Sequence, residues 1–199
     1  MSPLGVAPGY EKYVASIPGG LDAYPAAQAK GTLVRSALLD QPREVLRALP
    51  SPVRRWVEDP PLDNDWVSET EYCALVHALG EARRWSEPEI LAWSRERNRD
   101  LLSGPLYRIL MTVATPEALL RHAGIRWANF HRGSTLTFLG FADDGARVGL
   151  AFPRRIFDPL MLRCFGEAFR ASLEIAHARK PVVLLEEIGD GFARYRAHW

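Results

Sequence analysis

His122 and His131 lie just before the part of the chain that alternates like a β-sheet, and a metal ion is the chemistry that such a pair could support. Metal sites usually collect three or four ligands at characteristic spacings. No cysteine, aspartate or glutamate completes such a spacing with these histidines. We therefore predict that the protein has no metal site, and that His122 and His131 are surface or helix-capping side chains.

The carboxylates give no stronger case for catalysis. Asp143 and Asp144 are adjacent, but they fall at the expected tip of a hairpin, where acidic residues are usually exposed. Glu186 is the one carboxylate that the strand pattern places inward, beside Tyr195, unless the strand register is shifted by one residue. The sequence has no Gly-rich phosphate loop, HExxH zinc motif or nucleophile elbow. We therefore predict no catalytic residues and favour a protein that is not an enzyme.

The elements that must position any site are clearest in the last third of the chain. Asp144-Gly145 and Asp190-Gly191 each divide two alternating apolar runs, and Asp-Gly between such runs is a strong hairpin signal. A long helix is expected between the two hairpins, from about Asp158 to Ala178. The pattern predicts a strand-strand-helix-strand-strand unit with an antiparallel sheet over residues 125–199.

The register of the first hairpin follows if Asp144-Gly145 forms a two-residue loop. Three cross-strand pairs would then form the core face: Phe141 with Val148, Leu139 with Leu150, and Thr137 with Phe152. The opposite face is also apolar and carries Leu136, Phe138, Gly140, Gly149 and Ala151. A strand that is polar on neither face is covered on both. We therefore expect a second cover here, from either the N-terminal helices or a second copy of the protein.

The second hairpin has a more polar face. A two-residue loop at Asp190-Gly191 pairs Glu187 with Arg194, Leu185 with Arg196 and Val183 with His198. The first of these pairs joins opposite charges across the strands, which favours this register.

Helical signals dominate residues 1–124. Ser68 with Glu71 and Ser86 with Glu89 form capping boxes ahead of two helices. Shorter helices are expected from Tyr10 to Ile17, within Pro25 to Leu39, and after Pro42, Pro52 and Thr115, whereas Ile125 to Phe130 is expected to be extended. The fold class is therefore α+β. We expect one domain over residues 1–199, with a helical layer (1–124) packed on the sheet unit (125–199), because no long flexible linker separates the two parts.

The bulk composition limits the partners. The chain has 199 residues, 47% of them hydrophobic, and a net charge of +1 with acids and bases interspersed, so we expect no nucleic-acid surface. No apolar run reaches the roughly 18 residues that span a bilayer, and the first residues lack a secretory signal pattern. We therefore expect no membrane association and a cytoplasmic location. Cys73 and Cys164 lie in apolar helical context and are predicted to be buried free thiols.

Aromatic residues supply the candidates for a binding site. The long helix alternates large and small side chains, which either pack on the sheet or leave a ligand cavity. The six tryptophans of the chain likewise either fill the core or line a pocket or an interface. The pocket that we predict between the long helix and the sheet is lined by Trp127, Phe138, Phe165, Phe169, Glu186 and Tyr195.

Three stretches resemble an uncharacterised paralogous family abundant in myxobacteria: Ala23 to Leu39, Asp65 to Glu69, and Pro116 to Trp199. The last of them, with its ending GDGFARYRAHW, is also similar to the heme–nitric oxide binding and four-vinyl reductase ligand-sensing domains. The resemblance implies a helical N-terminal part wrapped on an antiparallel sheet and a sensory role. Heme-binding members carry a Tyr-x-Ser-x-Arg motif for the propionates. This sequence has none, so we expect no heme and no other cofactor.

Together these observations predict a non-enzymatic, cytoplasmic ligand-sensing or protein-interaction module of a signalling or regulatory system. We expect a small apolar ligand, and a protein partner or a homodimer. The alternative is an enzyme or carrier that acts on a small apolar molecule bound between the long helix and the sheet.

Overall fold

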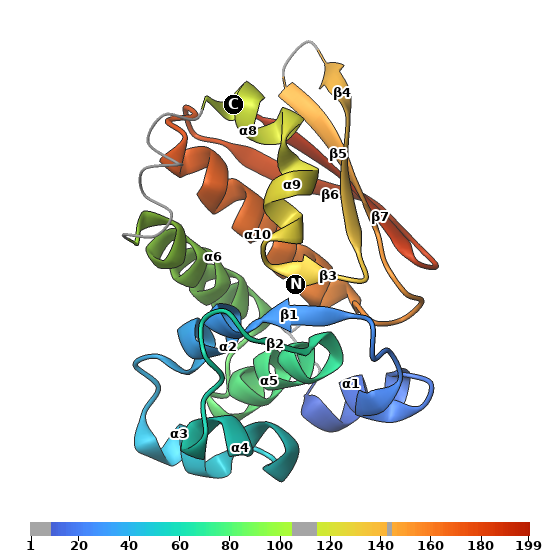
Figure 1. Ribbon diagram of the computed structural model, residues 1–199. Helices are drawn as coiled ribbons and strands as arrows, with labels where there is room; N and C mark the ends of the chain where they lie inside the picture. The colour runs from blue at the N-terminus through green and yellow to red at the C-terminus, as the bar shows by residue number, and fades with distance from the viewer. Residues whose placement is uncertain (1–8, 105–114, 143–144) are drawn as a thin grey trace, which may run out of the picture.

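The computed structural model of the chain describes residues 9–104, 115–142 and 145–199 (Figure 1). A four-stranded antiparallel sheet, in the order β4-β5-β7-β6, forms the C-terminal part. Its strands are β4 (Thr135–Ala142), β5 (Gly145–Ala151), β6 (Val182–Gly189) and β7 (Phe192–His198), and helix α10 (Pro159–Ile175) joins the two hairpins. The predicted strand-strand-helix-strand-strand unit and the α+β class are confirmed.

The N-terminal part is helical, as predicted, and its helices begin at the expected caps. Ser68 accepts a hydrogen bond from the backbone of Glu71, and Ser86 with Glu89 forms a complete capping box. The helices are α1 (Tyr10–Ser16), a 3-10 turn η1 (Gly20–Asp22), α2 (Gly31–Leu38), α3 (Arg43–Ala48), α4 (Ser51–Glu58), α5 (Glu69–Ala82), α6 (Glu87–Ser103), α8 (Pro116–Arg121) and α9 (Ala123–Ala128).

A small second sheet was not expected from the sequence. It has the order β2-β1-β3 and consists of β1 (Gln28–Lys30), β2 (Trp66–Ser68) and β3 (His131–Arg132). Strands of two or three residues are too short to show a period. This sheet joins segments that are far apart in the sequence and holds the helical layer against the C-terminal unit (Figure 1).

The expected extended segment from Ile125 to Phe130 is wrong, because residues up to Ala128 belong to helix α9. The helix lies beside strand β4 and buries Trp127, and such tertiary packing can outweigh the weak local preference of a short segment.

The predicted register of the first hairpin is wrong. Gly145 pairs with Ala142, so it belongs to strand β5 and not to a two-residue loop, and Asp143 and Asp144 lie outside the described residues. A bulge at Leu139 then shifts the strand, so that Phe138 pairs with Val148 and Phe141 with Ala146. The pairs Leu139–Leu150 and Thr137–Phe152 do not form, and Leu139 is 51% exposed.

The second hairpin keeps only part of its predicted register. Glu187 pairs with Arg194 as expected, with 2.7 Å between their charged atoms. A bulge at Glu186 displaces the rest, so Leu185 pairs with Tyr195 and Val183 with Ala197 instead of Arg196 and His198.

The sheet therefore has one apolar face and one mixed face. The inner face, formed by Leu136, Val148, Leu150, Ala193, Tyr195 and Ala197, is buried against the helices. The outer face, formed by Leu139, Arg147, Leu184, Glu186, Glu187, Arg194 and Arg196, is crossed by the Arg147–Glu186 and Arg194–Glu187 ion pairs. The described helices lie on the inner side of this sheet (Figure 1), so the N-terminal helices do not form the expected second cover over Phe138, Gly140, Gly149 and Ala151, and Phe138 itself faces inward. A cover by a second copy of the protein stays a prediction.

The core runs through both parts of the chain. Buried side chains from the helical layer, such as Tyr13 and Leu79, form one continuous cluster with Leu150 and Tyr195 of the sheet. Within the described ranges, no helix combines the length and the apolar character needed to cross a membrane.

A candidate ligand cavity with a buried His–Glu pair

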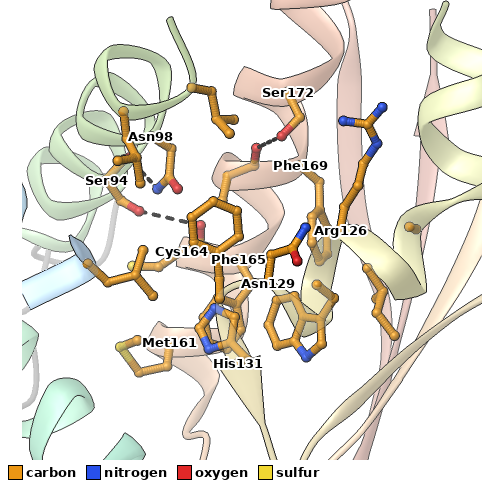
Figure 2. Close-up of a pocket in the computed structure, with 18 of the residues that line it drawn as sticks. Ser94, Asn98, Arg126, Asn129, His131, Met161, Cys164, Phe165, Phe169 and Ser172 are labelled. Carbon is orange, nitrogen blue, oxygen red and sulfur yellow. Dashed lines mark hydrogen bonds between the residues drawn. The ribbon is translucent and has the colours of Figure 1, made fainter. Parts of the chain in front are cut away.

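A cavity of about 130 Å³ lies between α6, α9, α10 and the inner face of the sheet (Figure 2). Its walls are mainly apolar and include aromatic rings from four elements. Helix α10 supplies the longest side of the cavity, with Met161, Cys164, Phe165, Ala168, Phe169 and Ser172.

The most unusual group on the cavity wall is His131. Its Nδ1 lies 2.9 and 3.2 Å from the two carboxylate oxygens of Glu69, and the side chains of both residues are almost completely buried. Glu69 is the first residue of α5, where the free backbone amides of the helix favour a negative charge. The carboxylate accepts a hydrogen bond from Nδ1–H, and Nε2 lies on the other side of the imidazole ring.

Aromatic packing fixes the orientation of this imidazole. The ring of His131 stacks on Trp127 with 4.0 Å between centroids, and the edge of Phe165 meets it at 5.4 Å. The indole nitrogen of Trp127 in turn donates to Ser134 at 2.9 Å. Figure 2 shows His131 beside Phe165 and Met161, at the opposite end of the cavity from Ser172.

Several other polar side chains on the wall are satisfied by nearby backbone. Asn98 donates to the carbonyl of Ser94, Ser94 donates to the carbonyl of Cys164, and Ser172 donates to the carbonyl of Ala168. Burial lowers the pKa of the Arg126 guanidinium, which also lines the cavity. His131 thus differs from these side chains, because its imidazole is held in place by the buried carboxylate of Glu69.

Three of the six predicted pocket residues line this cavity, namely Trp127, Phe165 and Phe169. Their role in binding a ligand stays a prediction. Tyr195 lies behind Phe169, with ring centroids 5.1 Å apart, and its hydroxyl donates to the carbonyl of Leu162. Phe138 packs on Phe141 at the far end of β4.

Glu186 lies on the other side of the sheet and was wrongly placed inward. The bulge in β6 turns its carboxylate to the outer face, where it accepts a hydrogen bond from Arg147 at 3.1 Å. The structure therefore brings Trp127, Phe165 and Phe169 together and places the acidic candidate outside the cavity.

His131 and Glu69 were missed as a pair. The sequence predicted a surface or capping role for His131, yet only 6% of the residue is exposed. Glu69 precedes it by 62 positions and directly follows β2, while His131 is the first residue of β3, and both strands are too short to be recognised from the sequence. No local signal joins the two residues, because only the small sheet brings them together.

One buried cluster has the residue types of a nucleophile site but not its accessibility. Cys73 and His77 are one turn apart on α5, and Nε2 of His77 lies 3.3 Å from Asp158. Burial raises the pKa of the Cys73 thiol well above its usual range, so the sulfur stays protonated and closed to solvent. Both cysteines are free and buried, as predicted.

Among the residues that the structure describes, no group of three His, Cys, Asp or Glu side chains could hold a metal ion.

Solved structures with the same arrangement identify the fold. The chain is similar to a Cs H-NOX mutant that carries 4-cyano-L-phenylalanine, with a TM-score of 0.59 and 16% identity over 84% of this chain and 94% of that one. The chain has the H-NOX fold. An oxygen-binding H-NOX domain related to soluble guanylate cyclases matches with a TM-score of 0.59 and 15% identity over 84% of this chain and 89% of that one.

A third structure, from work on heme distortion in the H-NOX family, has a TM-score of 0.60 at 15% identity, with 84% and 89% of the two chains covered. The similarity to H-NOX domains that the C-terminal sequence predicted is confirmed at the level of the H-NOX fold. No protein-family model and no curated protein sequence matches the chain, so its resemblance to a myxobacterial family stays a prediction.

Proposed function

We propose that this domain senses a small, largely apolar molecule that binds in the cavity beside His131. The observation that carries this proposal is an apolar cavity of about 130 Å³ whose wall includes an imidazole anchored by a buried carboxylate. Apolar cavities of about 150 Å³ in proteins bind benzene, so a ligand of one aromatic ring matches this space.

Heme is the first ligand to test, because the work on one of the similar H-NOX structures concerns a heme. Ligands of porphyrin or drug size occupy pockets of roughly 300–1,000 Å³, and the cavity here is about 130 Å³. His131 offers an imidazole, but Cys164 offers no thiolate, because burial raises the pKa of its thiol to about 12. The residues around the described cavity therefore do not fit a heme.

The cavity is also well placed for sensing. Its two longest walls, α6 and α10, are tied together at the surface by Glu174, whose carboxylate accepts from Arg95 and Arg99 of α6. A molecule that fills the space between these helices changes how they pack, and a change in helix packing is a common way to signal occupancy. We propose that the protein works in this way within a cytoplasmic signalling system, without catalysis and together with a protein partner or a second copy.

The alternative, an enzyme or carrier for the same kind of molecule, has less support. The His131–Glu69 pair resembles the imidazole and carboxylate of a general base. Catalysis through it needs a reactive partner group, and the thiol on the same wall, Cys164, is held protonated by its burial.

A titration with benzene tests the proposed cavity directly. Saturable binding of benzene to the purified protein, measured by ligand-observed NMR, is expected. Ala168→Leu places three extra carbons in the cavity and should weaken binding by at least about tenfold, that is by about 1.4 kcal/mol. Ala128→Leu makes the same change on the exposed side of α9 and should leave binding unaltered. Equal binding by all three proteins, or no saturable binding by any, would refute the proposal.

A further inference from the structure

The His131–Glu69 pair restricts the chemistry of the ligand. We propose that the ligand is a small phenol-type molecule, a single aromatic ring whose hydroxyl donates a hydrogen bond to Nε2 of His131. This inference rests on the proposed function, because it assumes that the cavity is a binding site. It adds the polar group that the ligand carries and the residue that receives it.

The first step of the argument is the tautomer of His131. Both oxygens of Glu69 lie within 3.2 Å of Nδ1, and a carboxylate can only accept a hydrogen bond. The Nδ1 position therefore carries a proton. In the neutral imidazole the other nitrogen, Nε2, is then an acceptor, so a ligand group that meets it must be a donor.

The second step is the direction in which Nε2 is available. One face of the imidazole is covered by Trp127, Phe165 of α10 makes a T-shaped contact with the ring, and the Nδ1 side is closed by Glu69. His131 nevertheless lines the cavity. Within the described ranges no hydrogen bond joins Nε2 to another residue, so the cavity side is where a ligand can reach it.

The third step is the body of the ligand. The rings of Trp127, Phe165 and Phe169 surround the same space, with Trp127 and Phe165 edge to face at 5.1 Å. Aromatic walls in these orientations favour another planar ring, since edge-to-face and offset contacts add to the burial of apolar area. A flat ring with one donor on its rim satisfies both the walls and His131.

The fourth step separates a phenol from other donors. A buried carboxylate behind an imidazole stabilises positive charge that the imidazole gains when a proton approaches Nε2. A hydroxyl that shares its proton readily therefore gains most from this pair, and a phenol does so more readily than an aliphatic alcohol. The His131–Glu69 pair therefore favours a ligand whose hydroxyl donates a strong hydrogen bond to Nε2.

The test compares phenol with fluorobenzene, which has nearly the same shape and no donor. In the wild-type protein we expect phenol to bind about tenfold more tightly, because one net hydrogen bond is worth about a factor of ten in affinity. In the double variant Glu69→Met/His131→Phe the order should reverse, because a buried hydroxyl without an acceptor is unfavourable. His122→Phe, an exposed histidine outside the cavity, should keep the wild-type preference.

The double variant removes the charge and its partner together, so it avoids leaving a buried charge alone. Glu69→Gln is a second, milder variant, which keeps an acceptor for Nδ1 but loses the charge and should reduce the preference for phenol several-fold. The inference is overturned if the double variant keeps the wild-type ratio, or if fluorobenzene binds the wild-type protein as tightly as phenol. In both cases the proposed function stands. If neither probe binds the wild-type protein, both proposals fail.

Discussion

The buried His131–Glu69 pair makes a quantitative prediction about stability. His131→Phe keeps a ring against Trp127 but leaves the Glu69 carboxylate buried without its partner. Leaving a buried carboxylate without a compensating partner costs about 3–5 kcal/mol, and the N-terminus of α5 offsets about 1 kcal/mol of this by stabilising the carboxylate. We therefore expect His131→Phe to lower the free energy of unfolding by about 2–4 kcal/mol.

Glu69→Met and the double variant Glu69→Met/His131→Phe complete a double-mutant cycle with His131→Phe. Glu69→Met leaves one buried imidazole N–H without an acceptor, which costs about 1–3 kcal/mol. When both residues are replaced, no unpaired polar group remains, so the double variant should lose only about 0–2 kcal/mol. The two single losses thus exceed the double loss by at least about 1 kcal/mol, and by about 4 kcal/mol at the midpoints of these ranges.

Urea unfolding followed by far-UV circular dichroism measures all four proteins without relying on the fluorescence of Trp127. The reasoning is refuted if the loss in the double variant equals the sum of the two single losses within about 0.5 kcal/mol, because the residues would then act independently.

Three further outcomes are expected. Gly191 has a φ of +92° and its added Cβ would lie 2.9 Å from the carbonyl oxygen of Phe152, so Gly191→Val should lower the free energy of unfolding by about 2 kcal/mol, whereas Gly166→Ala, in ordinary contact at 3.6 Å, should not. A thermal midpoint of Gly191→Val equal to that of the wild type would contradict the hairpin geometry. Burial acts to raise the pKa of Asp158, but the hydrogen bond and charge of His77, with Met161 and Arg163, outweigh it and lower that pKa. The stabilisation that Asp158 provides over Asp158→Asn, about 1 kcal/mol, should therefore be complete only well above the unfolded pKa of about 3.9 and be lost as the pH falls through the lower pKa of the folded state, which acid unfolding curves of both proteins would test. Cys73 and Cys164 should react with a thiol reagent at pH 8 at least about a hundredfold more slowly in the native protein than in urea, and equal rates would show that the thiols are accessible.

Local signals in the sequence were sufficient for most of the elements. The serine caps at Ser68 and Ser86 begin α5 and α6, and each depends on residues only three positions apart. The alternating apolar runs around Asp190-Gly191 likewise predict the second hairpin, because both strands and the turn are contiguous in the sequence.

The register of the strands could not be predicted from the sequence. Single-residue bulges at Leu139 and Glu186 each change which face the following residues occupy, and a bulge has no composition of its own. The aromatic part of the candidate site could be predicted, because Phe165 and Phe169 follow the period of α10. The His131–Glu69 pair could not, because it depends on a contact between distant segments.

The three-stranded sheet has a consequence for how the protein folds. It pairs Gln28 of β1 with both Ser68 of β2 and Arg132 of β3, so it closes a loop of about a hundred residues. Contacts of such large sequence separation carry the highest loop-closure entropy and form slowly. Glu69 and His131 are carried by the outer strands of this sheet or directly follow them, so they can meet only after the loop has closed. The His131–Glu69 pair is therefore expected to be among the last features to form, and a partly folded chain would lack the site that we propose for the ligand.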